Sequence, residues 1–384
     1  MNPIFAALKT TVFTEMSALA AKHGAVNLGQ GFPDSEGPRD VREAATSAIL
    51  DGSNQYPPMQ GLPALRQAIA DHYRRFQGLD FDPQAEVLVT AGATEAITAS
   101  ILALVSPGDE VAMIQPLYDS YLPMTRLAGG IPRLITLEPP HWDLTEQALS
   151  VIGPKTRVLI LNNPLNPGAV VYTPEQLGRL AERCIRHDVT VITDEVWEHV
   201  VFDGRTHTPL IALPGMRDRT VKIGSAGKIF SLTGWKVGWV CAAPVLASQI
   251  AKAHQFITFT VAPGTQAAVA YGLGKADDYF TGMRADFTRS RDRLAQGLEA
   301  EGFALLPSQG TYFLNIDLNA SGLDLDDRTF CLRAVQEAGV AAIPVSAFYE
   351  ENAVTGIVRL CFAKKDETVD RGIEGLAKAK RLFG

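Results

Sequence analysis

The sequence has little cysteine, no excess of basic residues and no long apolar run. Its four cysteines, Cys184, Cys241, Cys331 and Cys361, include no CxxC pair, which leaves neither a disulfide framework nor a zinc ribbon to be read. Lys plus Arg number 35 against 42 for Asp plus Glu, and this balance argues against a nucleic-acid or polybasic membrane surface. No window reaches the ~18 uninterrupted apolar residues of a membrane span. The absences predict a cytoplasmic protein that acts on small molecules, with no metal, nucleic acid or membrane partner.

What is present is an ordinary globular composition, with 46% hydrophobic and 20% charged residues. At roughly 150 residues per domain, the 384 residues suggest two domains or one large domain with an appendage. The segment Met1 to Thr14 lacks the basic start and apolar core of a signal peptide.

From residue 86 to about residue 242, short β-branched runs alternate with helical stretches. The predicted strands are Val87 to Thr90, Val111 to Ile114, Arg157 to Leu161, Val189 to Thr193, Val221 to Gly224 and Gly238 to Ala242. Near-continuous apolar strands separated by helices, such as those at 94–105 and 174–187, are typical of a mostly parallel sheet covered on both faces. The fold class is therefore α/β.

The two ends of the chain have a different pattern. Helices are predicted at 15–24, 39–51 and 62–76, with a Gly- and Pro-punctuated loop at 26–34 that is not a core strand. Beyond about residue 285 the pattern gives a long charged helix, a strand at 311–316, a helix at 326–338 and a strand at 357–362. We interpret this part as a smaller α+β unit, completed by the N-terminal segment.

Polar residues follow several predicted strands, at the edge where ligands bind in open α/β sheets. Ala91 to Glu95 opens a helix with small residues, which suits either a phosphate on backbone N–H groups or an ordinary tight turn. Asp194 ends an apolar strand, where an acid either caps the next helix or addresses a ligand. In Asn162 to Gly168, prolines hold Asn166 in an aimed position or simply form a turn. Lys228, flanked by small residues, is either a surface lysine or a shielded amine fit for Schiff-base chemistry.

Five motifs in order resemble those of the class I/II aminotransferases, pyridoxal-phosphate enzymes of fold type I. They are 163–168 (Asn-Pro-Leu-Asn-Pro-Gly), 194–196 (Asp-Glu-Val), 225–228 (Ser-Ala-Gly-Lys), 234–238 (Gly-Trp-Lys-Val-Gly) and 358–360 (Val-Arg-Leu). Residues 27–34, with 54–56 and 118–121, most resemble the branch of methionine and kynurenine–oxoglutarate aminotransferases. The resemblance implies a large sheet domain at 46–284, an N-terminal arm at 1–45 that joins the small domain, and a C-terminal small domain at 285–384.

The resemblance also implies the roles of the cofactor-site residues. Lys228 would form a Schiff base with pyridoxal 5'-phosphate and later carry the proton, and Asp194 would pair with the pyridine nitrogen. Asn166 would donate to the ring's phenolate oxygen, and Tyr118 would stack on the ring. The residues expected to gather the phosphate are Gly92, Ala93, Thr94, Ser225 and Lys236.

One position departs from the family's pattern, because Trp197 stands where relatives usually have a tyrosine that contacts the phenolate oxygen. The indole N–H donates one hydrogen bond but neither accepts nor titrates as a phenol does. Trp197 therefore either replaces tyrosine as the donor, or packs elsewhere and leaves that contact to Asn166.

For the substrate, the resemblance implies that Arg359 clamps the α-carboxylate beside Asn166 and the Gly29 backbone. The aromatics on segments expected to line the pocket, each of which could instead be core, are Phe32, Tyr56, Tyr118, Phe259 and Phe348. No second arginine there invites a dicarboxylate, so methionine-like and aromatic amino acids are favoured. Tyr56 would reach the neighbouring subunit's phosphate, which implies a homodimer with shared sites.

The predicted function is ping-pong transfer of an amino group from such an amino acid to a 2-oxo acid. The same machinery also serves C–S lyases that act on cystathionine-like substrates, and this alternative stays open here. A transcriptional regulator that has this fold but no catalytic activity is disfavoured, because the chain has no DNA-binding extension or basic helix.

Overall fold

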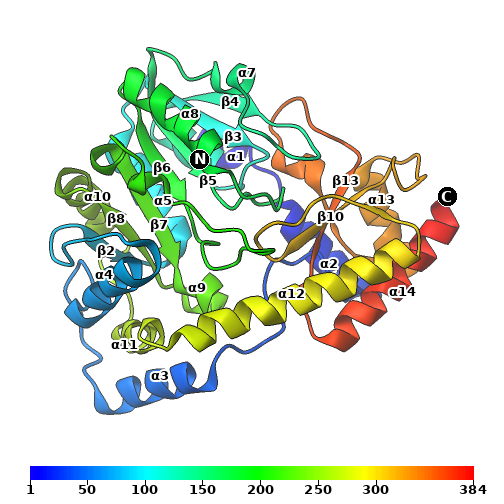
Figure 1. Cartoon of the computed structure of the whole chain (residues 1–384), viewed down its shortest axis with the longest axis horizontal. Helices are drawn as coiled ribbons and strands as arrows, with labels where there is room; N and C mark the ends of the chain where they lie inside the picture. Colours follow the sequence, from blue (N-terminus) through cyan, green and yellow to red (C-terminus); the bar gives the residue numbers. More distant parts are fainter.

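The computed structural model describes residues 1–384, and its centre is a seven-stranded sheet in the order β2-β8-β7-β6-β5-β3-β4 (Figure 1). The strands are β2 Val87–Thr90, β3 Glu110–Gln115, β4 Ile131–Thr136, β5 Thr156–Asn162, β6 Thr190–Asp194, β7 Thr220–Ser225 and β8 Gly238–Ala242. Strands β4, β3, β5, β6 and β7 pair in parallel, whereas β8 is antiparallel to both β7 and β2. The prediction of a mostly parallel α/β sheet is confirmed.

Both faces of this sheet are buried. On β5, Val158 and Ile160 belong to one hydrophobic cluster, whereas Leu159 and Leu161 belong to another. Successive side chains of a strand point to opposite faces. The strand is therefore apolar at nearly every position, because each face packs against its own layer of helices.

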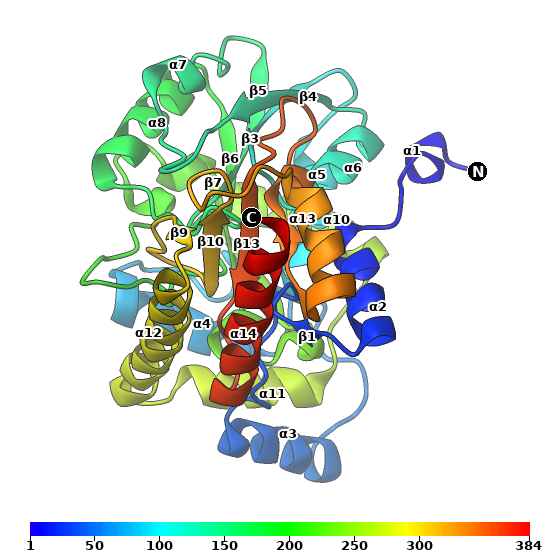
Figure 2. The ribbon, with the colours of Figure 1, turned by 90° about the vertical axis from the view of Figure 1, so that its right-hand side faces the viewer.

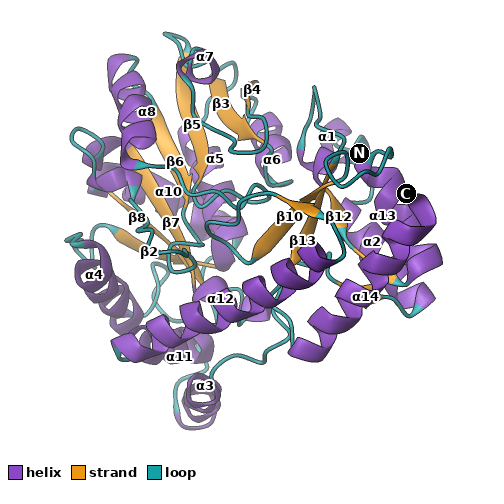
Figure 3. Cartoon of the chain, turned by 45° about the vertical axis from the view of Figure 1, so that its right-hand side comes forward, coloured by secondary structure: helices purple, strands orange, loops and turns teal.

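Helices lie on both sides of the sheet (Figure 3). On one side α5 packs against α10 and against β6, β7 and β8, and on the other α8 shares a hydrophobic cluster with β5. The bounds of the helices in this part are α3 Arg39–Asp51, α4 Pro63–Gln77, α5 Gly92–Leu104, α6 Tyr121–Leu127, α7 Glu146–Leu149, α8 Pro174–Arg186, α9 Ala226–Ile229, α10 Pro244–Ile257 and α11 Pro263–Leu273. None of the protein's helices is both long and apolar enough to cross a bilayer.

A second, smaller sheet lies beside the first, in the order β12-β13-β10-β9 (Figures 1 and 3). Its strands are β9 Ala304–Leu305, β10 Phe313–Asp317, β12 Ile343–Pro344 and β13 Ile357–Cys361. The long helix α12 (Asp277–Ala300) runs from the large sheet's side of the molecule to α14 (Asp366–Phe383), against which it packs (Figure 1). Helix α13 (Asp327–Arg333) packs against β12 and β13.

The N-terminal segment joins this second part. Strand β1 (Val26–Asn27) pairs in parallel with β11 (Val340–Ala341), and α2 (Val12–His23) packs against both. The short α1 (Pro3–Ala6) projects from the body in Figure 2. We predicted residues 26–34 as a loop, and this is wrong for Val26 and Asn27. The hydrogen bonds that make them a strand come from a segment distant in sequence, which local composition does not reveal.

The sequence pattern also missed several elements. Edge strand β4 has alternating partial exposure, so it lacks the continuous apolar run of the inner strands. Helices α10, α11 and α14 were not predicted either. The predicted helix at 39–51 and the strands at 87–90 and 238–242 agree with α3, β2 and β8 to the residue.

Candidate active site

A cavity of about 380 Å³ opens at the carboxyl ends of the large sheet's strands, with β10 and β13 of the second sheet on its other side. Of the residues predicted to be catalytic or to bind the cofactor or the substrate, only Gly29 and Tyr56 do not line it. Those that do are Phe32, Gly92, Ala93, Thr94, Tyr118, Asn166, Asp194, Trp197, Ser225, Lys228, Lys236 and Arg359. The fold thus brings together residues that are far apart in the sequence.

The cavity lining includes an amine and a carboxylate from neighbouring strand ends. Asp194 is the last residue of β6, and Lys228 lies in α9, which follows directly on β7. Burial lowers the pKa of the Lys228 amine to about 8, against the opposing effect of Asp194. Burial raises the pKa of the Asp194 carboxyl, although Tyr121 opposes this by donating a hydrogen bond from its hydroxyl to Oδ2 at 2.7 Å. Asp194 is thus a carboxylate whose charged form needs a cation beside it.

The part of the cavity lining at the start of α5 has the features of an anion site. Helix α5 begins there without a side-chain cap, so its first N–H groups are not satisfied by a capping side chain. Gly92 has a φ of +77°, and a Cβ on it would lie 3.1 Å from the Lys236 amine. A Cβ on Gly238 would lie 2.6 Å from the Gly92 carbonyl carbon. Only glycines permit this close approach, which leaves a cradle of backbone donors and one lysine that suits a phosphate.

The turn before α5 is held by Glu95 and His254, through contacts that the sequence did not predict. Glu95 accepts a hydrogen bond from the Ala91 N–H at 2.5 Å, and its other oxygen lies 2.6 Å from Nδ1 of the buried His254. His254 Nε2 donates to the Met59 carbonyl at 3.0 Å. This chain of contacts fixes the anion cradle to the segment that follows Tyr56.

Arg359, on β13 of the second sheet, also lines the cavity, and 1% of its surface is exposed. Its two terminal nitrogens donate to Asn166 Oδ1 at 2.8 Å and to the Gly29 carbonyl at 3.0 Å, and its guanidinium lies 3.9 Å from the centre of the Phe313 ring. Nε has no hydrogen-bond partner, and the groups that shift the pKa of Arg359 include no carboxylate. Burial lowers the pKa of Arg359 to about 10. A buried cation with a free donor and no carboxylate is suited to bind one from a ligand.

Other aromatic residues are placed differently from the prediction. Phe259 and Phe348 do not line the cavity, whereas Phe13 and Phe313 do. Phe348 is buried and packs near the Arg359 guanidinium. Tyr56 is 82% exposed and stands outside the cavity of its own chain, with its ring edge against Phe259.

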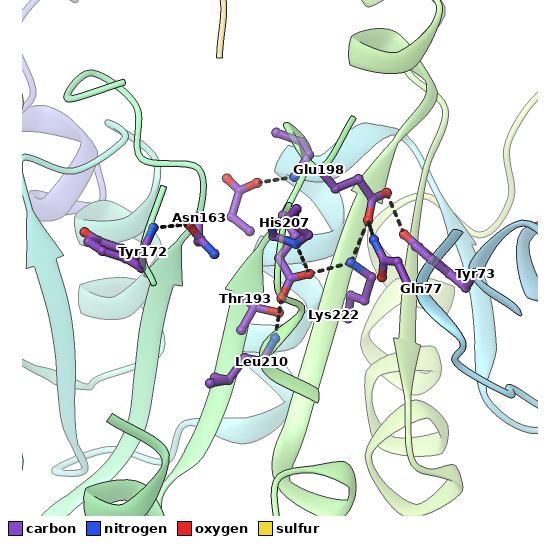
Figure 4. Close-up of polar contacts among 12 residues, drawn as sticks. Tyr73, Gln77, Asn163, Tyr172, Thr193, Glu198, His207, Leu210 and Lys222 are labelled. Atoms are coloured by element: carbon purple, nitrogen blue, oxygen red, sulfur yellow. Dashed lines mark hydrogen bonds and ion pairs between the residues drawn. The ribbon is translucent and has the colours of Figure 1, made fainter. Parts of the chain in front are cut away.

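The residues that follow Asp194 belong to a buried network of charges, in which Figure 4 labels Tyr73, Glu198, His207 and Lys222. The amine of Lys222 on β7, with 0% of its side chain exposed, contacts Glu195 at 2.5 Å and Glu198 at 2.7 Å. His207 lies 2.9 Å from the same Glu195 oxygen, and Tyr73 donates to Glu198 at 3.1 Å. Burial alone would raise the pKa of Glu195, but Lys222 and His207 lower it to about 2. The network anchors the segment that follows Asp194 to the neighbouring strand.

Removing the cation of this network should destabilise the fold. In Lys222→Met, Glu195 and Glu198 lose their charged partner within the sheet, and we expect unfolding free energy to fall by about 3–5 kcal/mol. Urea unfolding followed by circular dichroism measures this. Adding Glu195→Gln to the variant should recover part of the loss, because one unpaired charge is removed. A loss below about 1 kcal/mol in the single variant would show that the network is not held by charge.

The large sheet with its one antiparallel strand, the lysine directly after β7 and the small sheet over the cavity define an α/β enzyme of fold type I, the class that uses pyridoxal phosphate. The chain belongs to the class I and II aminotransferases, whose family model matches residues 23–376. It is an aminotransferase that uses pyridoxal 5'-phosphate.

Similar proteins share nearly the whole chain. The structure of N-succinyldiaminopimelate aminotransferase from Mycobacterium tuberculosis is 45% identical, covers 99% of this chain and 100% of its own, and superposes with a TM-score of 0.96. A methionine aminotransferase structure from Escherichia coli is 41% identical over 98% of this chain and 99% of its own, with a TM-score of 0.95. Kynurenine–oxoglutarate transaminase of Dictyostelium discoideum is 37% identical over 97% of this chain and 94% of its own.

Proposed function

We propose that the enzyme transfers the amino group of an apolar or aromatic amino acid, with methionine-like side chains favoured, to a 2-oxo acid by a ping-pong mechanism. This substrate class is supported by the small number of cationic side chains that line the cavity. The cavity is lined by only three, Lys228, Lys236 and Arg359. If Lys228 bonds the cofactor and Lys236 binds its phosphate, Arg359 is the one cation that remains to bind a carboxylate of the substrate. A second carboxylate would then be buried without a partner, which is costly.

The residues of the cavity fit pyridoxal phosphate on their own chemistry. The uncapped start of α5, Lys236 and Ser225 suit its phosphate, and Asp194 suits its pyridine nitrogen. Tyr118 lines the cavity and offers a ring to stack on, and Asn166 offers an amide donor to the phenolate oxygen. When bound, the cofactor supplies an aldehyde that condenses with amines and a ring that accepts electrons from the substrate's Cα.

The protein's own side chains then transfer protons, hold charge and bind the substrate. Lys228 has a pKa of about 8, so its amine can take a proton at one stage and return it at another near neutral pH. Asp194, held by the Tyr121 hydroxyl, keeps a negative charge where the ring nitrogen must stay positive. Arg359 binds the α-carboxylate, and its contacts with Asn166 and Gly29 fix the direction in which the guanidinium faces.

The substrate proposal is tested with a screen of amino donors against several 2-oxo acids, scored by half-reaction spectra of the purified enzyme. Methionine and aromatic donors should give the highest kcat/KM. If aspartate, glutamate or N-succinyldiaminopimelate gave the highest kcat/KM, the proposal that the pocket selects apolar side chains would be wrong. Release of pyruvate and ammonia from cystathionine without an acceptor would instead identify a C–S lyase.

We also propose a homodimer in which Tyr56 completes the partner's site, since Tyr56 is exposed and lies outside its own cavity. Tyr56→Ala should lower kcat/KM by about 10–100-fold, the value of a hydrogen bond to a charged group. Mixing Tyr56→Ala with Lys228→Ala subunits should then restore roughly a quarter of wild-type activity, because half the dimers are hybrids with one complete site. No recovery in verified hybrids would place Tyr56 in its own subunit's site.

The domain division and the cellular setting are proposals of the same kind. The contact of Arg359 with Gly29 and the pairing of β1 with β11 support one small domain built from residues 1–45 and 285–384, which closes on substrate against residues 46–284. All four cysteines are buried and free. This supports a cytoplasmic location, where thiols stay reduced.

A further inference from the structure

The amine of Lys228 lies in a corner between two aromatic side chains. Nζ donates a hydrogen bond to the Tyr312 hydroxyl at 3.2 Å, and it stands over the ring of Trp197, 4.7 Å from the ring centre. The two rings meet edge to face, with centres 4.3 Å apart and planes at 88°. Trp197 is 3% exposed and Tyr312 is fully buried. The corner is therefore rigid and shielded from water.

Both walls of the corner favour a protonated amine. An aromatic face attracts a cation, and tryptophan does so most strongly. The Tyr312 hydroxyl donates its own proton to the Gly31 carbonyl at 2.5 Å. Its oxygen can therefore only accept from Lys228, and it cannot donate to the lone pair of a neutral amine.

We propose that Trp197 and Tyr312 hold the Lys228 amine whenever it is not bonded to the cofactor, and that Trp197 acts through the face of its ring and not through its N–H. This rests on the proposed role of Lys228. It gives a function to the position where this chain has tryptophan in place of the family's usual tyrosine. Both residues are positioning residues, since they act through the lysine.

Other groups also shift the pKa of the Lys228 amine. Burial lowers the pKa of Lys228 most, Asp194 and Cys361 raise it, and Arg359 and Lys236 lower it. The aromatic corner offsets part of the burial, so that the free amine keeps a proton available at the reaction's working pH. Tyr312 also ties this position to Gly31, on the arm that carries Gly29.

The test measures the pKa of Lys228 in the full-length protein loaded with pyridoxamine 5'-phosphate, which cannot bond the lysine. Trace acetic anhydride labels free amines, and mass spectrometry gives the labelled fraction of Lys228 against pH, with the exposed Lys252 as internal reference. Trp197→Leu should lower the pKa of Lys228 by about one unit, whereas Trp197→Phe, which keeps a ring face, should change it by much less. Tyr312→Phe should lower it as well, because the acceptor is lost.

The comparison of phenylalanine with leucine decides between the explanations. Equal shifts in Trp197→Phe and Trp197→Leu would show that the indole N–H matters, and no shift in Trp197→Leu would show that the ring does not hold the amine. Either result overturns the proposal. If Trp197→Leu does not fold, Tyr312→Phe alone must lower the pKa, and an unchanged value overturns the proposal. Borohydride reduction of the pyridoxal-loaded enzyme, with peptide mapping, tests the role of Lys228 separately.

Discussion

Replacing Lys228 with alanine should lower kcat by at least about 10⁴-fold, the largest effect expected for any single change in this protein. The side chain is proposed both to bind the cofactor covalently and to carry the proton. The other amine that lines the cavity, Lys236, lies near Gly92 at the start of α5. The visible absorbance of lysine-bound cofactor should vanish with the activity. Steady-state amino transfer and an absorbance spectrum of the purified variant measure both.

Lys252→Ala is the matched control, because this lysine is exposed on α10 and does not line the cavity. It should keep wild-type kcat and spectrum. Lys228→Arg should be as inactive as Lys228→Ala, because a guanidinium stays protonated near neutral pH and cannot take up the proton. If Lys228→Ala kept substantial activity or the absorbance of lysine-bound cofactor, the proposed role of Lys228 would be wrong.

Asp194→Asn should lower kcat by about 10²–10³-fold, the usual cost of losing one preorganised charged or polar contact at the reacting group. Asparagine has the same shape and can still accept from the Tyr121 hydroxyl, but it carries no charge to keep the ring nitrogen positive. The fall should appear in kcat more than in KM of the amino acid, because Asp194 is proposed to contact the cofactor and not the substrate.

Tyr121→Phe separates charge from hydrogen bonding. This variant keeps the carboxylate but loses its 2.7 Å hydrogen bond, so its kcat should fall far less than that of Asp194→Asn. Equal losses in the two variants would mean that Asp194 serves only to order its surroundings. A near-wild-type Asp194→Asn would remove the carboxylate from the reaction.

The site residues that could be predicted from the sequence lie in short motifs, and each motif can be recognised from a few neighbouring residues. Asp194 ends an apolar strand, Gly92 opens a helix and Lys228 follows a strand among small residues, and each of these features follows from a few neighbouring letters. The carboxyl ends of parallel strands meet at one edge of a sheet, so the sequence alone predicts that these motifs lie together. The family resemblance added their roles, and the family is confirmed.

The tertiary structure alone decided the contacts that tune those residues. The sequence predicted no contact for Tyr312 or Tyr121, because nothing local distinguishes a buried tyrosine with a catalytic partner from one that only fills space. Tyr312 reaches Lys228 from 84 positions away, and Tyr121 reaches Asp194 from 73. Likewise, the pairing of Lys222 with Glu195 depends on the register of β6 beside β7, and strand β1 exists only because β11 pairs with it. Hydrogen bonds and ion pairs between distant segments follow from packing, and packing is a property of the whole chain.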